Sequence, residues 1–303
     1  MATSGLFDRL INEALQYPPL PVAVVDPEEV HVLEAILEAT RGKLLRPVLV
    51  GAPNRIREFY TRLPELTSIP VEDGGDDPVS FSVKLYHTGQ VSALVKGHVP
   101  TAELLHGFLK QLNIKERLSH IFIAELSSYP KLLFITDAAI NIAPDLETKA
   151  DILRNAIELA RKLGINLPKV AVLSAIEFVN PAIPSTIDAA CLAKMSERGQ
   201  IRNAIVDGPL AFDNAISLES STIKRIHSPV SGDVDILLVP DMVSGNILAK
   251  DLEYLAGATL AGLVVGAGSV PIILNSRSDS PRSRLVSCAV ASLAFHRQTN
   301  KGP

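Results

Sequence analysis

Short runs of aliphatic residues alternate along this chain with longer stretches in which apolar residues recur every three or four positions. The short runs predict buried strands, and the longer stretches predict amphipathic helices. The predicted strands are residues 22–25, 48–50, 92–95, 121–124, 132–135, 170–173, 204–206, 236–239, 263–265 and 270–274. Strands that alternate with helices form sheets covered on both faces, so the pattern predicts an α/β fold with three α/β/α layers.

One connection between predicted strands indicates that the sheet is not purely parallel. Residues 121–124 and 132–135 are separated by a short segment with turn-forming residues. A connection this short joins antiparallel strands, because a parallel pair needs a long crossover. We therefore expect a mostly parallel sheet with a mixed part.

Capping residues predict two helix starts. Asp26, followed by Pro27 and by a glutamate three residues after the cap, is typical of a helix start. Ser280 and Pro281 predict the start of the last helix in the same way. Residues 68–75 are rich in turn formers, so we expect an exposed loop there.

The length and composition set limits on the class of protein. A chain of 303 residues is long enough for two domains, and the charged segment 115–117 is a candidate boundary. The chain is 47% hydrophobic but only 5% aromatic, which suits helices packed on a buried parallel sheet. A net charge of −4 without a basic run argues against nucleic acid as a partner.

Several features predict a cytoplasmic protein. The first nine residues carry charges where a signal peptide needs an apolar core. Residues 254–274 carry no charge and are long enough to span a membrane, but glycines and Pro271 interrupt them, so we expect soluble core. Cys191 and Cys288 lie in apolar helical patterns and are predicted to be buried thiols in a reducing compartment. Neither the cysteines nor the seven histidines have the spacing of a metal site, so no metal is expected.

Polar residues accumulate where the predicted strands end. In open α/β sheets, ligands bind beyond the carboxyl ends of the strands, so we expect the substrate site at this edge. These residues are Lys96 and Gly97, Thr136 and Asp137, Ser174, Asp207 and Gly208, Asp241, and Asn275, Ser276 and Arg277.

The turn at 276–281 is a candidate oxyanion site. It joins a predicted strand to a predicted helix, where free backbone N–H groups and the helix dipole favour an anion. Arg277 adds a two-pronged donor that matches phosphate or carboxylate. The alternative is an arginine that caps a neighbouring helix or forms a surface ion pair, and this stretch alone does not distinguish the two.

A second candidate anion site follows the predicted strand 236–239. Ser244, Gly245 and Asn246 begin a helix, and Lys250 lies one turn later. Glycine permits close backbone approach, asparagine can donate and accept, and lysine supplies positive charge. The alternative is an ordinary capped helix with a solvated lysine.

Several common fingerprints are missing. Residues 266–271 begin like a dinucleotide loop, but Pro271 stands where the third glycine belongs. The chain contains no Walker-type loop, no G-x-S-x-G elbow and no H-E-x-x-H motif. Nothing in it points to a cofactor-dependent redox enzyme, a P-loop NTPase or a serine hydrolase.

Taken together, these stretches resemble the phosphate acetyltransferase/phosphate butyryltransferase family. The resemblance is carried by residues 207–215, by 239–246 with Lys250 and by 270–280, and runs from about Pro21 to the C-terminus. Segments 94–97 and 101–103 add weaker support. The amino-acid sequences of segments 134–144 and 180–186 most resemble the transferase half of bifunctional enoyl-CoA hydratase/phosphate acetyltransferase proteins.

The resemblance implies a fold and a reaction. The fold is of the isocitrate/isopropylmalate dehydrogenase type, with residues 1–117 and 266–303 in one domain and 118–265 in an inserted domain. The resemblance also implies an active site in the cleft of this two-domain fold, and a homodimer or larger homo-oligomer. The reaction converts acyl-CoA and phosphate reversibly into acyl phosphate and CoA, with CoA as a substrate and no permanently bound cofactor.

The resemblance also implies site residues. Ser276 and Arg277 match the family's Ser-Arg pair, with Arg277 on phosphate and Ser276 bonding the reacting thioester or phosphate. Asn246 and Lys250 would line the same cleft. The other candidate substrate-binding residues are Lys96, Gly97, His106, Asp241 and Gly245.

Two positions depart from the family pattern. The acetyltransferases carry a proposed Asp base six residues after the Ser-Arg arginine, where this chain has Ser283. Asp279 is the nearest carboxylate and is either a catalytic residue or the cap of the last helix. His106 stands where the family often has an arginine. These changes place the chain nearer the butyryltransferases.

We therefore expect a phosphate acyltransferase for acetyl to butyryl groups that works through a direct ternary complex. The alternative is a catalytically degenerate module that binds CoA or acyl phosphate. A third possibility, a metal- and NAD-dependent hydroxyacid dehydrogenase, rests on fold analogy alone and lacks the carboxylate cluster that it needs.

Overall fold

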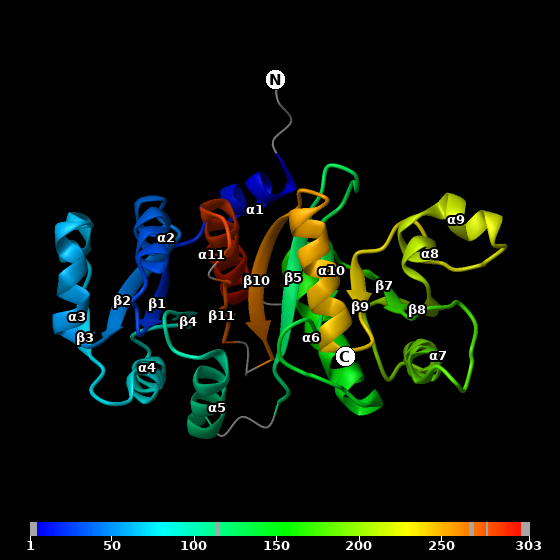
Figure 1. Cartoon of the computed structure of the whole chain (residues 1–303), viewed down its shortest axis with the longest axis horizontal. Coiled ribbons are helices and arrows are strands. Elements are labelled where there is room, and N and C mark those ends of the chain that lie inside the picture. Colours follow the sequence, from blue (N-terminus) through cyan, green and yellow to red (C-terminus); the bar gives the residue numbers. More distant parts are fainter. Residues whose placement is uncertain (1–4, 113–115, 267–269, 277, 298–303) are drawn as a thin grey trace. The chain divides into compact units, whose positions relative to one another are not determined.

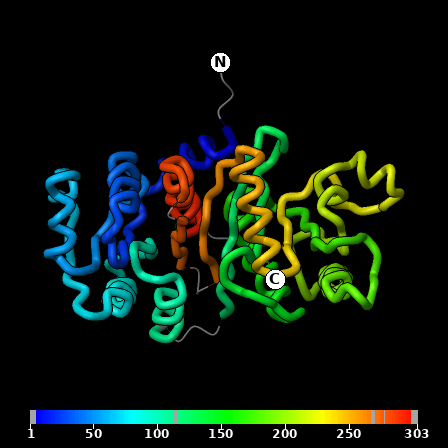
Figure 2. Tube along the Cα trace, in the orientation of Figure 1, coloured from blue at the N-terminus to red at the C-terminus, as the bar shows by residue number. Residues whose placement is uncertain are grey.

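The computed structural model describes residues 5–112, 116–266, 270–276 and 278–297 (Figure 1). These residues form two compact units. The first contains the described residues of Met1–Glu116 and Ala261–Gln298, and the second contains Arg117–Leu260. Figure 2 shows the C-terminal helix of the first unit, in red, close to N-terminal segments in blue. Both ends of the chain therefore build the first unit.

The sheet of the first unit is parallel except at one edge. Its strand order is β3-β2-β1-β4-β11-β10, and only the β10–β11 pair is antiparallel. Val22 of β1 pairs with Ala93 of β4, and Leu94 of β4 pairs with Ile272 of β11. The strands are β1 (Leu20–Val25), β2 (Leu45–Gly51), β3 (Val71–Asp73), β4 (Ala93–Lys96), β10 (Thr259–Val265) and β11 (Ile272–Ile273).

Most helices of the first unit are partly buried, and the last is buried over most of its length. In α11 (Pro281–His296), almost all residues from Ser283 to Ala294 are buried. The hydroxyl of Ser280 accepts the N–H of Ser283, and Pro281 occupies the first turn, as predicted. The other helices are α1 (Leu6–Ala14), α2 (Val30–Arg41), α3 (Pro53–Glu58), η1 (Phe59–Thr61), η2 (Pro64–Ser68), α4 (Pro78–His87) and α5 (Thr101–Leu112).

The second unit has a mixed sheet with strand order β5-β6-β9-β7-β8. The β5–β6 pair is antiparallel and the other pairs are parallel, which confirms the predicted hairpin and the mixed α/β class. The strands are β5 (Ser119–Glu125), β6 (Leu133–Thr136), β7 (Lys169–Leu173), β8 (Ile205–Leu210) and β9 (Ile236–Leu238).

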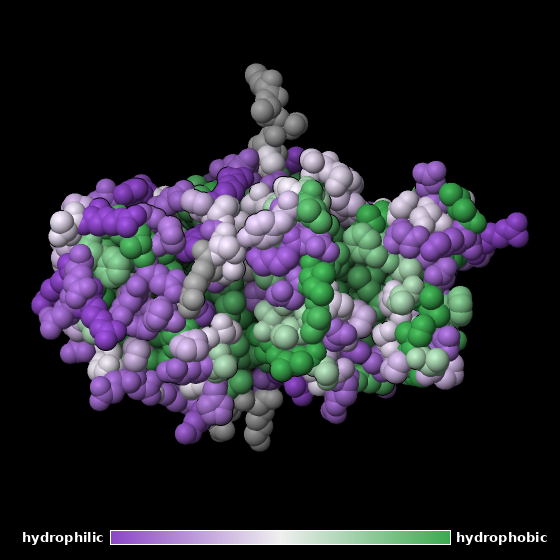
Figure 3. Space-filling model, in the orientation of Figure 1, coloured by the Kyte–Doolittle hydropathy of each residue, from purple (hydrophilic) through white to green (hydrophobic). Residues whose placement is uncertain are grey.

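Helices pack on the sheet of the second unit from different sides. On one face, Ala249 of α10 packs with Ile135 and Leu237 of the sheet, while α6 contacts the same strands without joining this cluster. Figure 3 shows apolar side chains along the outer surface of α10, where Val243 and Ile247 are each 56% exposed. The helices are α6 (Leu146–Lys162), α7 (Pro184–Glu197), α8 (Phe212–Ile216), α9 (Leu218–Ile223) and α10 (Met242–Tyr254).

Three sequence-based predictions were wrong in detail. Asp26 does not cap α2, because its backbone has a φ of 53° and its carbonyl accepts the N–H groups of Glu28 and His98; Glu29 occupies the cap position instead. Residues 68–75 contain the edge strand β3, whose side chains are largely polar and exposed and so gave no apolar signal. Cys288 is buried as predicted, whereas Cys191 is only partly buried.

None of the helices in the described parts of the chain combines the length and the apolar character needed to cross a bilayer.

Candidate functional site

The loop after β11 is held by the carboxylate of Asp279. One oxygen of this carboxylate accepts the N–H of Ser276 at 2.9 Å and the side-chain amide of Asn275 at 3.1 Å. The alternative role of Asp279 as a helix cap was wrong, because Ser280 caps α11. Arg277 lies outside the described residues.

The first turns of α11 fix the same loop from the other side. The guanidinium of Arg284 donates from Nη2 to the carbonyl oxygen of Ser276 and from Nε to that of Asp279, both at 3.3 Å. Asn275 also donates to the hydroxyl of Ser287 at 3.0 Å. The sequence reasoning missed Arg284, although a charged residue at the start of the apolar stretch 285–294 was a usable signal.

The residue that replaces the family's Asp base is part of the helix start. Ser283 is buried, and its N–H donates to the hydroxyl of Ser280 at 3.0 Å. The two hydroxyl groups also form a hydrogen bond of 3.0 Å. Ser283 therefore stabilises the first turn of α11.

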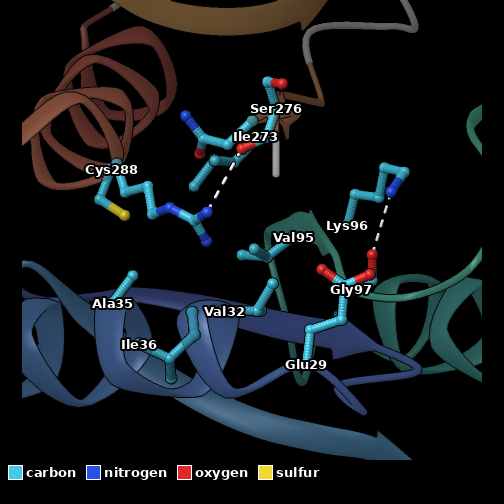
Figure 4. Close-up of a pocket in the computed structure, with 12 residues that line it drawn as sticks. Glu29, Val32, Ala35, Ile36, Val95, Lys96, Gly97, Ile273, Ser276 and Cys288 are labelled. Carbon is cyan, nitrogen blue, oxygen red and sulfur yellow. Dashed lines mark hydrogen bonds between the residues drawn. The ribbon is translucent and has the colours of Figure 1, made fainter. Parts of the chain in front are cut away.

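Lys96, Gly97 and Ser276 lie together at one pocket of the first unit (Figure 4). The Nζ of Lys96 donates to the carbonyl oxygen of Gly97 at 3.0 Å. The polar lining also includes Glu29, Asn275 and Arg284, and the remaining lining is mostly aliphatic. Two cations against one carboxylate give this described wall a net positive charge, which suits an anionic ligand.

The pocket is small. Its volume of about 30 Å³ has room for one or two water molecules. Ligand pockets for larger molecules have volumes of roughly 300–1,000 Å³. A pocket of this volume is too small to enclose a molecule as large as CoA.

Gly97 is required by the packing of two strand ends. A Cβ atom at this position would lie 2.2 Å from the carbonyl oxygen of Asp26 and 2.4 Å from that of Val25. The N–H of Gly97 donates to the Val25 carbonyl at 2.9 Å. The close backbone approach that a glycine permits is used here between β4 and β1.

Burial raises the pKa of the nearby Asp26 carboxyl above its ordinary value, and the neighbouring Glu28 raises it further. His98 and Arg55 oppose this effect, and Glu103 adds to it.

Asp241 and Asn246 make hydrogen bonds within the second unit, at the start of α10. Asp241 caps the helix by accepting the N–H of Ser244 at 2.8 Å. The side-chain amide of Asn246 donates to the carbonyl oxygen of Ala138 at 3.2 Å. Asp241 thus stabilises the first turn of α10, and Asn246 connects α10 to the loop after β6.

Gly245 and Lys250 also have structural contacts. A Cβ atom on Gly245 would lie 2.6 Å from Val239 and 3.0 Å from the carbonyl oxygen of Asp137, so the glycine allows α10 to approach the strand ends. The Nζ of Lys250 lies 2.6 Å from the carboxylate of Glu253 and 5.6 Å from the Tyr254 ring centre. Lys250 is thus an anchored lysine on α10, not a solvated one.

His106 lies on the exposed side of α5 and does not line the pocket at Lys96.

The polar strand ends of the second unit have partly structural roles. The carboxylate of Asp137, only 2% exposed, accepts the N–H groups of Ala139 and Ile140 at 3.0 Å and that of Asn141 at 3.2 Å. The hydroxyl groups of Ser174 and Ser185 are 2.8 Å apart. The accumulation of polar residues after strands therefore reflects turn formation as well as any binding site.

The described residues contain no group of three or more His, Cys, Asp or Glu side chains arranged to hold a metal ion.

Comparison with known proteins identifies the family. The family model described as "Phosphate acetyl/butaryl transferase" matches residues 68–292. A phosphate acetyltransferase of Rhizobium meliloti is 45% identical over 306 residues, covering 98% of this chain and 96% of the relative. A phosphate butyryltransferase of Clostridium beijerinckii is 38% identical over 297 residues, covering 96% of this chain and 98% of the relative.

A solved structure leads to the same family. The branched-chain phosphotransacylase of Enterococcus faecalis V583 is 32% identical, with a TM-score of 0.80 over 92% of this chain and all of that chain. This likeness confirms the α/β fold of dehydrogenase-like type. The extent of these matches shows that the chain belongs to the phosphate acetyltransferase/phosphate butyryltransferase family.

Proposed function

We propose that this protein is a phosphate acyltransferase that transfers a short-chain acyl group reversibly between CoA and inorganic phosphate. The observation that carries the proposal is the family match over residues 68–292, which includes the loop at Ser276. Acetyl- and butyryltransferases both align over nearly the whole chain, which supports a short-chain acyl group from acetyl to butyryl.

The reaction exchanges one bond to the acyl carbon for another. An oxygen of phosphate attacks the thioester carbonyl carbon, and the C–O bond forms as the carbonyl oxygen becomes an oxyanion. The C–S bond then breaks, the electron pair leaves with the CoA sulfur, and the thiolate takes up a proton. Because charge develops on the carbonyl oxygen, preorganised donors at that point lower the barrier.

We propose roles for the residues of the first unit. Arg277 binds phosphate, and the hydroxyl of Ser276 donates to the reacting thioester or phosphate. Lys96 and Gly97 form the wall beside them. Lys96, Gly97 and Ser276 line one pocket, which supports their part in this assignment. Asp279 acts through its hydrogen bonds to the loop, because its carboxylate accepts the N–H of Ser276.

The second unit is proposed to supply the other substrate contacts, through Asp241, Gly245, Asn246 and Lys250. His106 is kept as a further candidate phosphate donor. We propose the domains 1–117 with 266–303 and 118–265, an assignment supported by the two compact units. We also propose a cytoplasmic location and a homodimer or larger homo-oligomer. The exposed apolar side chains of α10 support the oligomer.

The deciding experiment measures CoA release from acetyl-, propionyl- and butyryl-CoA with and without phosphate, using a thiol reagent. We expect release that requires phosphate and is fastest with one acyl length. Arg277→Ala should reduce it by at least about 100-fold, as expected for the loss of a charged transition-state donor. No release from any thioester, together with CoA binding in calorimetry, would overturn the proposal in favour of a degenerate binding module.

The protein's own thiols set the background of this assay. Burial raises the pKa of the Cys288 thiol to about 12, so almost none of it is thiolate at pH 8. Cys191 is partly buried and can react slowly. Protein without acyl-CoA therefore serves as the blank.

A further inference from the structure

We propose that Arg284 is a positioning residue for acyl transfer, which fixes the backbone carbonyl group of Ser276. The inference rests on the proposed function of that loop, and it concerns a residue outside the Ser-Arg pair.

The two peptide groups that flank Ser276 are held by opposite charges. The carboxylate of Asp279 accepts the N–H of Ser276 at 2.9 Å, which fixes the peptide group before this residue. The guanidinium of Arg284 donates to the carbonyl oxygen of Ser276 at 3.3 Å, which holds the carbonyl group of this residue. The backbone of Ser276 is therefore held at both its N–H and its carbonyl group.

Arg284 also restrains the other end of the loop. Its Nε donates to the carbonyl oxygen of Asp279 at 3.3 Å, one residue before the cap of α11. One rigid side chain thus bridges the loop between positions 276 and 279. A planar guanidinium suits this role because it presents several donors in a fixed geometry, whereas an ammonium is a flexible point charge.

The burial of Arg284 argues against an incidental contact. Arg284 is 5% exposed, and it lies in a helix whose following residues are almost all buried. A buried charge is costly unless it is hydrogen-bonded or paired. An aliphatic side chain would avoid this cost at the same position, so a role in ordering the loop explains the arginine better than packing does.

Loop order matters for this reaction because both substrates must meet in one geometry. A displacement of about 1 Å can cost about 100-fold in rate when it moves a positioned reacting group. If Arg277 binds phosphate, a looser peptide at 276 should weaken phosphate use first. CoA binding should change less.

The test compares three purified full-length variants in the phosphate-dependent CoA release assay. Arg284→Met removes the hydrogen-bond donors of the guanidinium but keeps an unbranched side chain. Arg284→Lys keeps the positive charge but lacks the planar guanidinium group. We expect Arg284→Met to lower kcat by about 100-fold and to raise the KM for phosphate. We expect Arg284→Lys to recover part of this loss, with the calorimetric Kd for CoA within about threefold of wild type in both variants.

Arg282→Met is the matched control. Arg282 lies two residues earlier on α11 and forms an ion pair with Asp8 of α1, away from the loop. Both side chains of this pair are 41% exposed, so its loss should leave the melting temperature almost unchanged. Its kcat and KM for phosphate should remain within twofold of wild type.

The outcomes separate the proposals. If wild-type protein does not release CoA with phosphate, the proposed function fails, and this inference fails with it. If wild type is active but folded Arg284→Met keeps its kcat and phosphate KM, only the inference is overturned. Should Arg284→Met not fold, Arg284→Lys decides: at least a fivefold loss of kcat/KM for phosphate with an unchanged melting temperature supports positioning, and unchanged kinetics refute it.

Discussion

The ionised carboxyl group of Asp26 lowers the stability of the folded protein. It is half-buried at the end of β1, where the backbone is in the left-handed region. Burial and the neighbouring Glu28 raise its pKa above the ordinary value of 3.8. The folded protein therefore binds this proton more tightly than the unfolded chain does. The contribution of Asp26 to stability falls as the pH rises from about the unfolded value through the folded one.

Asp26→Asn should accordingly stabilise the protein at pH 7. The amide is neutral, has nearly the same shape and tolerates a positive φ. We expect the free energy of unfolding at pH 7 to be higher in the variant, because the neutral amide avoids the cost of a partly buried charge beside Glu28. The difference between variant and wild type in urea unfolding should shrink as the pH falls below 4. A variant that is less stable at pH 7 would show that the carboxylate makes a favourable contact.

At the level of single residues, the sequence predicted which positions have a structural role better than it predicted which atoms those residues contact. Ser280 was correctly identified as a cap because hydroxyl caps follow a local rule. Gly245 was selected as a place of close backbone approach, and it is one, but the approaching atoms belong to the protein. The same holds for Gly97, which was selected only as a residue at a strand end. Arg284 was missed because its two acceptors are backbone carbonyls, which leave no trace in residue identity.

At the scale of elements, the start of α10 combines a structural and a proposed binding role. Asp241 caps the helix through Ser244, and the following glycine packs against Val239. Buried strands and their companion helices were predictable from periodicity. The short edge strand β3 was not predictable, because it depends on pairing with β2. The start of α2 was not predictable either, because it depends on the hydrogen bond from the N–H of His98 to the carbonyl oxygen of Asp26.

Variants of Asp241 can separate these two roles. Asp241→Ala should lower the free energy of unfolding by about 1 kcal/mol, because the N–H of Ser244 loses its acceptor. Asp241→Asn keeps an acceptor oxygen and should lose less than half as much. Urea midpoints measure both. If the residue only caps the helix, kcat/KM for acyl-CoA stays near wild type in Asp241→Asn. A large loss of activity in this stable variant would instead indicate direct substrate contact.

At the scale of the whole molecule, the two compact units differ in how the chain builds them. The second unit is one continuous segment with its own core, which includes Ile135, Leu237 and Ala249. The first unit needs β11 beside β4 and needs α11, which contacts α1 and α2. Sequence patterns identified the strands of both units, but only the family resemblance indicated that distant ends of the chain join, because long-range pairing has no local signal.

This difference predicts how fragments behave. A fragment of residues 117–260 should fold alone and unfold cooperatively in urea, because strands β5 to β9 and the core that includes Ile135, Leu237 and Ala249 lie within it. A fragment of residues 1–116 should not, because without α11 the fully buried Phe7 would lose the helix that packs on α1. Circular dichroism and urea titration measure both.

A permuted fragment is the control for fragment 1–116, because it supplies the missing C-terminal segment. Residues 261–303, joined through a flexible linker to the start of 1–116, restore β11 and α11 to the first unit. Ends near each other make such a connection tolerable, and contacts between the two ends exist, since His296 stacks on Tyr17 at 5.0 Å and Arg297 pairs with Glu13 at 2.7 Å. We expect cooperative unfolding to return in the permuted fragment. Cooperative unfolding of fragment 1–116 alone would contradict the requirement for the C-terminal segment. If neither fragment 1–116 nor the permuted fragment folds, the first unit depends for its stability on residues outside it.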